Sequence, residues 1–197
     1  MLFKSSDISP SQSSAALMRE TSKRPKSLAY NSSAAFVSGN ELDVIRKEIG
    51  ALEAGKAVWF MTDGAWSNYH LLEYILELTG PAEVFFTTWA ISEDAITRFL
   101  NWKAAGMITE LAAVIDVGLR NRKPAIFQQA QAAFPNLKIA HIHAKATVVI
   151  SGTHHITFIG SSNYTKNPRK EVGAIFWDKD LASANANWIK EEVYGSN

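Results

Sequence analysis

The sequence predicts an α/β protein, an α/β/α sandwich with a mixed, mostly parallel sheet. Between residues 41 and 142, short apolar runs alternate with helical patterns. Such alternation is typical of parallel strands covered by helices on both faces. Two further apolar runs follow with no helix between them, which predicts a hairpin and makes the sheet mixed. The 197 residues are 47% apolar and contain no internal repeat, so we expect one domain with a substantial core.

Start and stop signals mark the expected helices. Asn40, Ser67 and Ser92 are typical N-cap residues, and each precedes a helical pattern. Gly80 and Pro81 end the second pattern. The expected helices span residues 41–54, 68–78, 92–105, 124–134 and 181–193.

Short apolar runs between and after these helices read as strands. A polar turn at 151–153 joins two of them into the hairpin. The expected strands span residues 57–61, 84–88, 111–117, 137–142, 146–150, 156–159 and 172–177.

The hairpin organises the polar residues that carry chemistry. Side chains alternate faces along a strand, so His143 and Lys145 share one face at the head of the first hairpin strand. The second strand then returns Ser161, Ser162 and Asn163 beside that head. The sequence therefore predicts that a nucleophile, a cation and an amide converge on one pocket.

These groups suit phosphoryl transfer through a covalent phosphohistidine. A neutral imidazole can attack phosphorus, and a carboxylate that bonds its other ring nitrogen holds the required tautomer; Glu171 is the candidate for that role. Lys145 and Asn163 would donate to the non-bridging phosphate oxygens. The predicted catalytic residues are His143, Lys145, Asn163 and Glu171, and the scheme needs no metal or other cofactor.

The pattern H-A-K at 143–145, G-S-S-N at 160–163 and then Glu171 resembles the motif of the phospholipase D superfamily. The single copy is most similar to the small bacterial endonuclease branch. The resemblance implies an α/β/α fold and a metal-independent phosphodiesterase, within that class a nuclease. The chain departs from the motif at Ile150, where the family usually carries an Asp that is thought to support the fold around the site.

A single motif has a consequence for assembly. Phosphohistidine chemistry needs a nucleophile on one side of phosphorus and an acid on the other, and one His143 cannot stand in both places. The resemblance implies that single-copy members solve this as homodimers. We therefore predict an obligate homodimer with one shared site, in which one His143 attacks and its protonated mate acts as the acid.

Loops that follow strands are expected to supply the substrate rim, and Trp66, Asn68 and Trp89 lie in such loops. A position in the core or at an interface is the more common one for a tryptophan such as Trp66. Lys166 belongs to a basic cluster that reads either as a phosphate contact or as a solvated loop, and a second cluster spans 120–123. The predicted substrate-binding residues are Ser161, Ser162, Lys166, Trp66 and Asn68.

Residues 1–40 are Ser-rich, and we expect a flexible N-terminal arm there before a domain at 41–197. Alternatively, Lys23, Arg24 and Lys26 contact nucleic acid or a partner subunit. The arm contains no signal-peptide core and the chain no apolar run of about 18 residues, which predicts no membrane span and, by default, a cytoplasmic location. The absence of cysteine excludes disulfides and zinc-thiolate sites.

Two other functions stay open. The first is a catalytically inactive, nucleic-acid-binding or scaffolding dimer, which Ile150 and the net charge of +1 favour. The second is a lipid phosphodiesterase, which the single motif and the lack of a membrane anchor disfavour.

Overall fold

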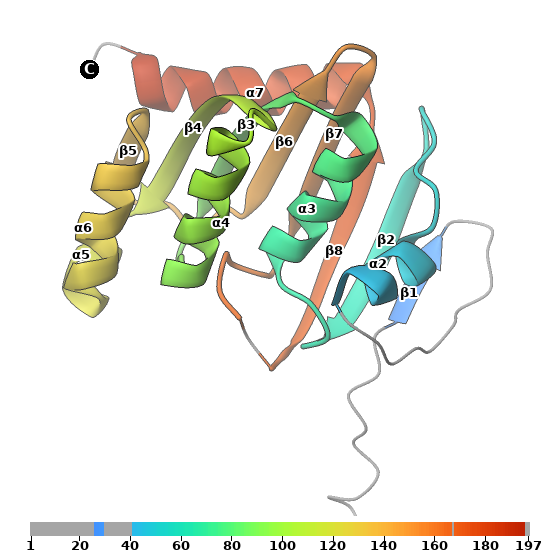
Figure 1. Ribbon diagram of the computed structural model, residues 1–197, viewed down its shortest axis with the longest axis horizontal. Coiled ribbons are helices and arrows are strands. Elements are labelled where there is room, and N and C mark those ends of the chain that lie inside the picture. Colours follow the sequence, from blue (N-terminus) through green and yellow to red (C-terminus); the bar gives the residue numbers. More distant parts are fainter. Residues whose placement is uncertain (1–25, 30–40, 167, 196–197) are drawn as a thin grey trace, which may run out of the picture.

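The computed structural model describes residues 41–166 and 168–195, together with the backbone of 26–29. One eight-stranded sheet runs through the molecule in the order β1-β2-β8-β7-β6-β3-β4-β5 (Figure 1). The strands are β1 (Lys26–Ala29), β2 (Ala57–Asp63), β3 (Ala82–Thr88), β4 (Ile108–Asp116), β5 (Leu137–Ala140), β6 (Ala146–Ser151), β7 (His154–Gly160) and β8 (Lys170–Trp177). The helices are α2 (Glu41–Ile49), α3 (Asn68–Thr79), α4 (Glu93–Ala104), α5 (Leu119–Arg122), α6 (Pro124–Ala133) and α7 (Lys179–Tyr194).

The predicted mixed α/β class is confirmed, but the expectation of a mostly parallel sheet was wrong at the level of strand pairs. Only β3 with β4 and β4 with β5 are parallel neighbours; the other adjacent pairs are antiparallel. The reason is that β6, β7 and β8 insert between β2 and β3. β6, β7 and β8 follow one another through short connections and therefore pair antiparallel. β2 and β3 run in the same direction, but they do not pair because these three strands lie between them.

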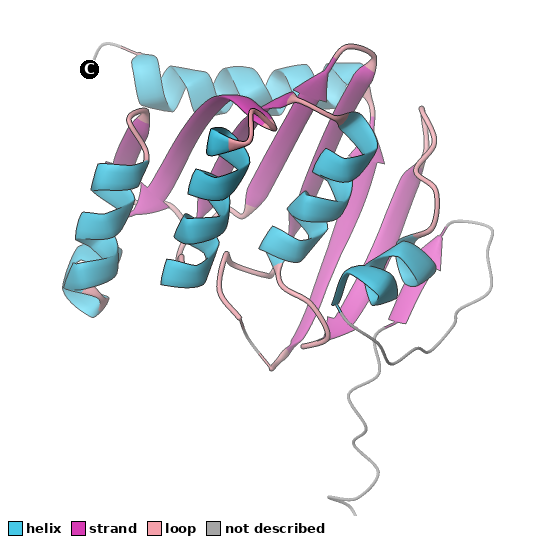
Figure 2. Ribbon diagram, viewed as in Figure 1, coloured by secondary structure: helices cyan, strands magenta, loops and turns pink. Residues whose placement is uncertain are grey.

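Helices cover both faces of the sheet, as expected for an α/β/α sandwich (Figure 2). On one face lie α2, α3, α4 and α6, over a core rich in aromatic rings. Phe86 is central there, with ring centres 4.8 Å from Phe99 and 4.9 Å from Tyr164. On the other face α7 packs on a smaller cluster that includes Phe85 and Val148.

Several boundaries differ from those predicted. The first helix ends at Ile49 rather than residue 54, because Gly50 adopts a positive φ of 67°. The strand expected at 137–142 ends at Ala140. Residues 141–145 then cross to β6 outside any strand. The short helix α5 was not predicted.

Part of the predicted N-terminal arm belongs to the sheet. Lys26–Ala29 forms the edge strand β1, which pairs antiparallel with β2. Residues 1–25 and 30–40 lie outside the described residues, and so do Lys23, Arg24 and the N-cap candidate Asn40. Among the described residues, no helix is long and apolar enough to cross a membrane.

Candidate active site

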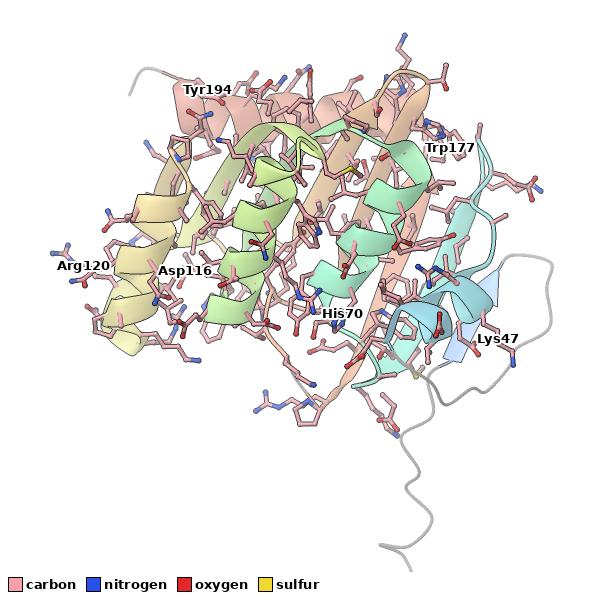
Figure 3. The ribbon with its side chains drawn as sticks, in the orientation of Figure 1. Lys47, His70, Asp116, Arg120, Trp177 and Tyr194 are labelled. Carbon is pink, nitrogen blue, oxygen red and sulfur yellow. The ribbon has the colours of Figure 1, made fainter. Side chains whose placement is uncertain are left out.

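The polar residues gather at one end of the sheet, where β3 and β4 finish and β6 begins. Thr87 in β3 is the sheet partner of Ala146 in β6, so the chain leaves β3 beside the segment that enters β6. In Figure 3, Asp116 at the end of β4 is labelled below Tyr194 and Trp177, which lie toward the opposite end of the sheet. The site is therefore built from segments far apart in the sequence.

His143 and Lys145 lie together in the segment before β6. The Nζ atom of Lys145 is 3.4 Å from Nδ1 of His143 and donates a 2.7 Å hydrogen bond to the carbonyl oxygen of the same residue. The His143 side chain is exposed, so a ligand can reach the ring. Burial lowers the pKa of Lys145, and the nearby carboxylates of Glu171 and Asp116 oppose that shift. A cation is thus held beside the candidate nucleophile.

Asn163 is held in one orientation by the loop after β3. Its Oδ1 atom accepts hydrogen bonds from the backbone N–H groups of Trp89 (3.1 Å) and Ala90 (3.2 Å), and Thr88 Oγ1 lies 3.3 Å away. Backbone N–H groups can only donate, so the atom they contact must be the amide oxygen. Tyr164, the next residue, is fully buried. The NH₂ group of Asn163 is therefore left as the donor that can meet a ligand.

The Gly-Ser-Ser-Asn turn packs closely on β8. Ser161 Oγ donates to the Glu171 carboxylate and accepts from Val172 N–H at 3.0 Å. A Cβ atom at Gly160 would come within 2.5 Å of the Val172 carbonyl oxygen, so glycine is required by this close approach. The observed partner of Glu171 is thus Ser161, and its predicted bond to His143 stays a prediction.

Three of the five predicted substrate-binding residues are buried. Trp66 is 5% exposed, with its ring centre 5.9 Å from that of Phe60, so it is a core residue and not a rim residue. Asn68 and Ser162 are also buried, and the Asn68 amide donates a 2.7 Å bond to the Ser162 carbonyl oxygen. The Asn68 side chain therefore holds the Gly-Ser-Ser-Asn turn in place. Lys166 is exposed, with Nζ 3.8 Å from Glu41 Oε1.

Sequence reasoning missed a cluster of three residues beside His143. The Trp89 ring centre lies 5.9 Å from that of His143, and the guanidinium carbon of Arg122 lies 3.8 Å from the same Trp89 centre. The Nη2 atom of Arg122 donates to the Trp89 carbonyl oxygen at 2.8 Å and to Asp116 Oδ1 at 2.9 Å. Trp89 was expected at the rim and Arg122 only within a basic cluster; no spacing in the sequence predicted that they stack.

Asp116 connects this cluster to the segment that carries His143. Its Oδ1 atom also accepts from Gly118 N–H at 3.0 Å, and Oδ2 accepts from Ile142 N–H at 3.4 Å. A Cβ atom at Gly118 would collide with the Arg122 guanidinium. The glycine therefore permits Arg122 to fold back over the turn, and Asp116 ties that turn to the residue before His143.

Ile150, which replaces the motif Asp, is remote from these groups. It lies near the far end of β6 from Lys145, roughly 16 Å along the strand at about 3.3 Å per residue. Its side chain packs with the cluster beneath α7. The substitution therefore removes no group from the site.

His70, at the start of α3, is a buried histidine that accepts a hydrogen bond from Ser67 N–H at 3.3 Å. Burial, and to a lesser extent the charge of Arg98, lowers its pKa from 6.5 to about 4. The imidazole is therefore neutral at pH 7 and serves the helix start. No group of three or more His, Asp or Glu side chains within the described part of the chain is arranged to hold a metal ion.

No family model and no curated protein matches the chain. Among solved structures, polyphosphate kinase from Porphyromonas gingivalis matches with a TM-score of 0.54 and 11% identity over 72% of this chain. Nuc, a phospholipase D family member from Salmonella typhimurium, matches with a TM-score of 0.46 and 18% identity over 61% of this chain and 85% of Nuc. TrmBL2, an archaeal chromatin protein, matches with a TM-score of 0.45 and 13% identity over 76% of this chain and 57% of TrmBL2.

These likenesses concern the fold alone. The match to polyphosphate kinase shows that this chain shares that protein's fold over 72% of its length, in agreement with the predicted α/β class. The chain spans about a quarter of that kinase, 26% of its length. The chemistry of this chain must therefore be argued from its own residues.

Proposed function

We propose that this protein is a metal-independent phosphodiesterase, specifically a nuclease, that acts through a phosphohistidine intermediate. The observation that carries the proposal is the convergence of His143, Lys145 and the anchored Asn163 amide at one end of the sheet. A ring nitrogen of His143 forms a bond to phosphorus as the bond to the departing oxygen breaks. The ammonium and the amide donate to the non-bridging oxygens, where they stabilise the transition state.

The proposed reaction needs a second histidine. The departing oxygen must receive a proton, and water must later lose one as it attacks the phosphohistidine and frees the imidazole. A protonated His143 from a second copy supplies the first proton and, once neutral, accepts the second. We therefore propose one composite site for each homodimer. Ile150 does not weaken this scheme, because its side chain lies away from the reacting groups.

The experiment that tests the function compares wild type with His143→Ala and His155→Ala. His155 pairs with Ile150 at the far end of β6, which makes it a matched histidine control. With bis(p-nitrophenyl) phosphate or plasmid DNA in excess EDTA, wild type and His155→Ala should cleave at similar rates. His143→Ala should lose at least about 1,000-fold, since it removes the attacking atom.

A folded, dimeric wild type that cleaves neither substrate would overturn the nuclease proposal. In that case the second candidate, an inactive nucleic-acid-binding dimer, makes its own prediction. Plasmid DNA would still be retarded by the wild type in a gel, with no nicking after prolonged incubation. The near-neutral net charge of +1 is the observation that keeps this candidate in view.

A further inference from the structure

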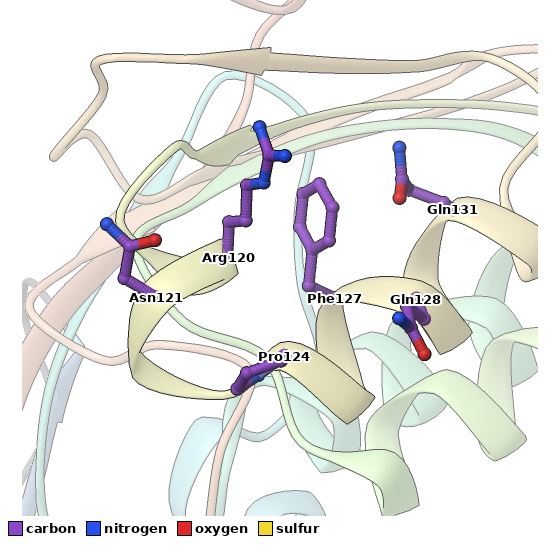
Figure 4. A pocket seen from close by; sticks show the side chains of 6 residues that line it. All are labelled: Arg120, Asn121, Pro124, Phe127, Gln128 and Gln131. Carbon is purple, nitrogen blue, oxygen red and sulfur yellow. The ribbon is translucent and has the colours of Figure 1, made fainter.

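A pocket lies between α5 and α6. Its volume is about 480 Å³, within the range of small-molecule sites. Figure 4 shows the Arg120 side chain and the Phe127 ring extending in the same direction from neighbouring helices, with Asn121 beyond the first and Gln131 beyond the second. The lining residues are Arg120, Asn121, Pro124, Phe127, Gln128 and Gln131.

The lining combines three kinds of chemistry. The Phe127 ring is half-buried and packs on the core, so its exposed part is held in place. Arg120 is exposed and, within the described part of the chain, its guanidinium has no carboxylate partner. Asn121, Gln128 and Gln131 offer amide donors and acceptors. A flat ring, amides and a free cation together fit a planar heterocycle with polar edges that is attached to a phosphate.

One turn of helix joins this pocket to the active site. Arg120 and Arg122 both belong to α5, and Arg122 faces the site. Its guanidinium carbon is 3.8 Å from the Trp89 ring centre, which is 5.9 Å from the His143 ring centre. The guanidinium is thus less than about 10 Å from the imidazole, and a nucleic-acid strand rises about 3.4 Å per nucleotide. Arg120 is two residues from Arg122 and therefore points to a different side of α5, so a strand held at His143 would pass around this short helix and reach the pocket after several nucleotides.

We propose that the α5–α6 pocket binds an unpaired nucleobase of a single-stranded nucleic-acid substrate. The base stacks on Phe127, its polar edge meets the amides, and Arg120 contacts the adjoining phosphate. A paired base is stacked inside its duplex and cannot lie on the ring, so the pocket selects single strands. This inference rests on the proposed phosphodiesterase function, and it adds which nucleic acid the site accepts.

The test measures binding in the non-cleaving His143→Ala background, by fluorescence anisotropy of labelled oligonucleotides. The probes are a single-stranded DNA, its duplex and an abasic strand with the same number of phosphates. The single strand should bind more tightly than both other probes. Adding Phe127→Ala should weaken binding of the single strand by about 5- to 30-fold and leave the abasic strand unchanged, because only the stacked base is lost.

Two pairs of neighbouring residues provide matched controls. Arg120→Ala should weaken the single and abasic strands equally and reduce the dependence of affinity on salt, whereas Lys123→Ala removes the same charge outside the pocket and should change affinity less than twofold. Gln128→Ala should weaken the base-containing strand. Gln129→Ala should not, because Gln129 lies outside the pocket lining and 3.5 Å from Glu93.

Two results would overturn the proposal: duplex binding as tight as single-strand binding, or an equal effect of Phe127→Ala on the base-containing and abasic strands. Hydrolysis of bis(p-nitrophenyl) phosphate separates this inference from the proposed function. That substrate is too short to reach from His143 into the pocket, so in the catalytically intact chain Phe127→Ala and Arg120→Ala should keep the wild-type rate. A wild-type protein that does not hydrolyse bis(p-nitrophenyl) phosphate would contradict the proposed phosphodiesterase function. The binding assay would still test whether the pocket binds a nucleobase.

Discussion

Arg122 is the residue whose structural role differs most from its appearance in the sequence. It lies in a basic run that could be solvated, yet its guanidinium stacks on Trp89 and bridges the Trp89 carbonyl oxygen to Asp116. Trp89 in turn donates its backbone N–H to Asn163. We therefore expect Arg122 to influence the proposed reaction through Trp89 and Asp116, as a positioning group.

Replacing Arg122 by Lys should separate positioning from charge. Lysine keeps the positive charge but cannot stack or bridge two acceptors in the same way. We expect kcat to fall by about 10- to 100-fold with little change in KM, because a small displacement of reacting groups lowers the rate more than binding. Steady-state kinetics on bis(p-nitrophenyl) phosphate measures both constants.

The matched control is Arg46→Lys. Arg46 lies in α2 and pairs with Asp43 of the same helix and with Glu77 of α3. The Arg46→Lys variant should leave kcat and KM unchanged. A rise in KM at constant kcat for Arg122→Lys would instead mean that the guanidinium contacts substrate, and unchanged kinetics would remove its positioning role.

At the scale of elements, the start of α3 contains a titratable group. The pKa of His70 is lowered from 6.5 to about 4, chiefly by burial, so the folded chain resists a proton that the unfolded chain accepts below about pH 6.5. Above pH 6.5 the neutral ring makes its full contribution to the free energy of unfolding, and this contribution is lost as the pH falls toward 4. The loss amounts to about 3 kcal/mol at 1.4 kcal/mol per pKa unit.

His70→Gln should flatten this pH dependence. Glutamine at the same helix position can still accept the Ser67 N–H but does not titrate. Urea denaturation at several values between pH 6.5 and 4 measures the slope for both proteins. His155→Gln, a change in β7, is the control, and its stability should depend on pH as that of the wild type does. If His70→Gln loses stability as steeply as wild type, another group causes the acid sensitivity.

The helices and strands themselves were largely predictable, because their signals are local. Ser67 and Ser92 precede α3 and α4, and an alternation of apolar runs with helices gave every strand from β2 to β8. The helix end and the short helix that were not predicted have local causes as well. Gly50 ends α2 early through its left-handed backbone. The four-residue helix α5 is too short for a periodic pattern to appear.

At the scale of the whole molecule, one part of the sheet carries exposed apolar side chains on the face where α7 packs. Trp59, Ile159 and Val172 are 40%, 42% and 41% exposed. Trp59 and Ile159 both pair with Ala174 in β8, so they share a face of the sheet. Ile159 precedes the Gly-Ser-Ser-Asn turn, and Val172 follows Glu171. This apolar patch is therefore continuous with the candidate site, and a second copy docked there would complete it.

Ile159→Arg tests this assembly. A charge in the centre of an apolar interface should dissociate the proposed homodimer, because removing that charge from water is costly. We expect a monomer by analytical ultracentrifugation and a loss of phosphodiesterase activity of at least about 100-fold, since each half-site lacks its acid. Leu100→Arg is the control: Leu100 is 45% exposed on α4, on the other side of the sheet, and should keep the dimer and the activity. An active Ile159→Arg monomer would contradict the shared site.

The α/β class, the hairpin and the proximity of His143 to Lys145 could be predicted from the sequence, because they depend on periodicity and on contacts between residues close in the chain. Tertiary structure alone decided the order of the strands, which depends on which apolar faces are buried together. It also decided that Trp66 belongs to the core, and that Asp116, Trp89 and Arg122 meet beside His143. Contacts of that kind join loops at the ends of different strands, and no spacing along the chain encodes them.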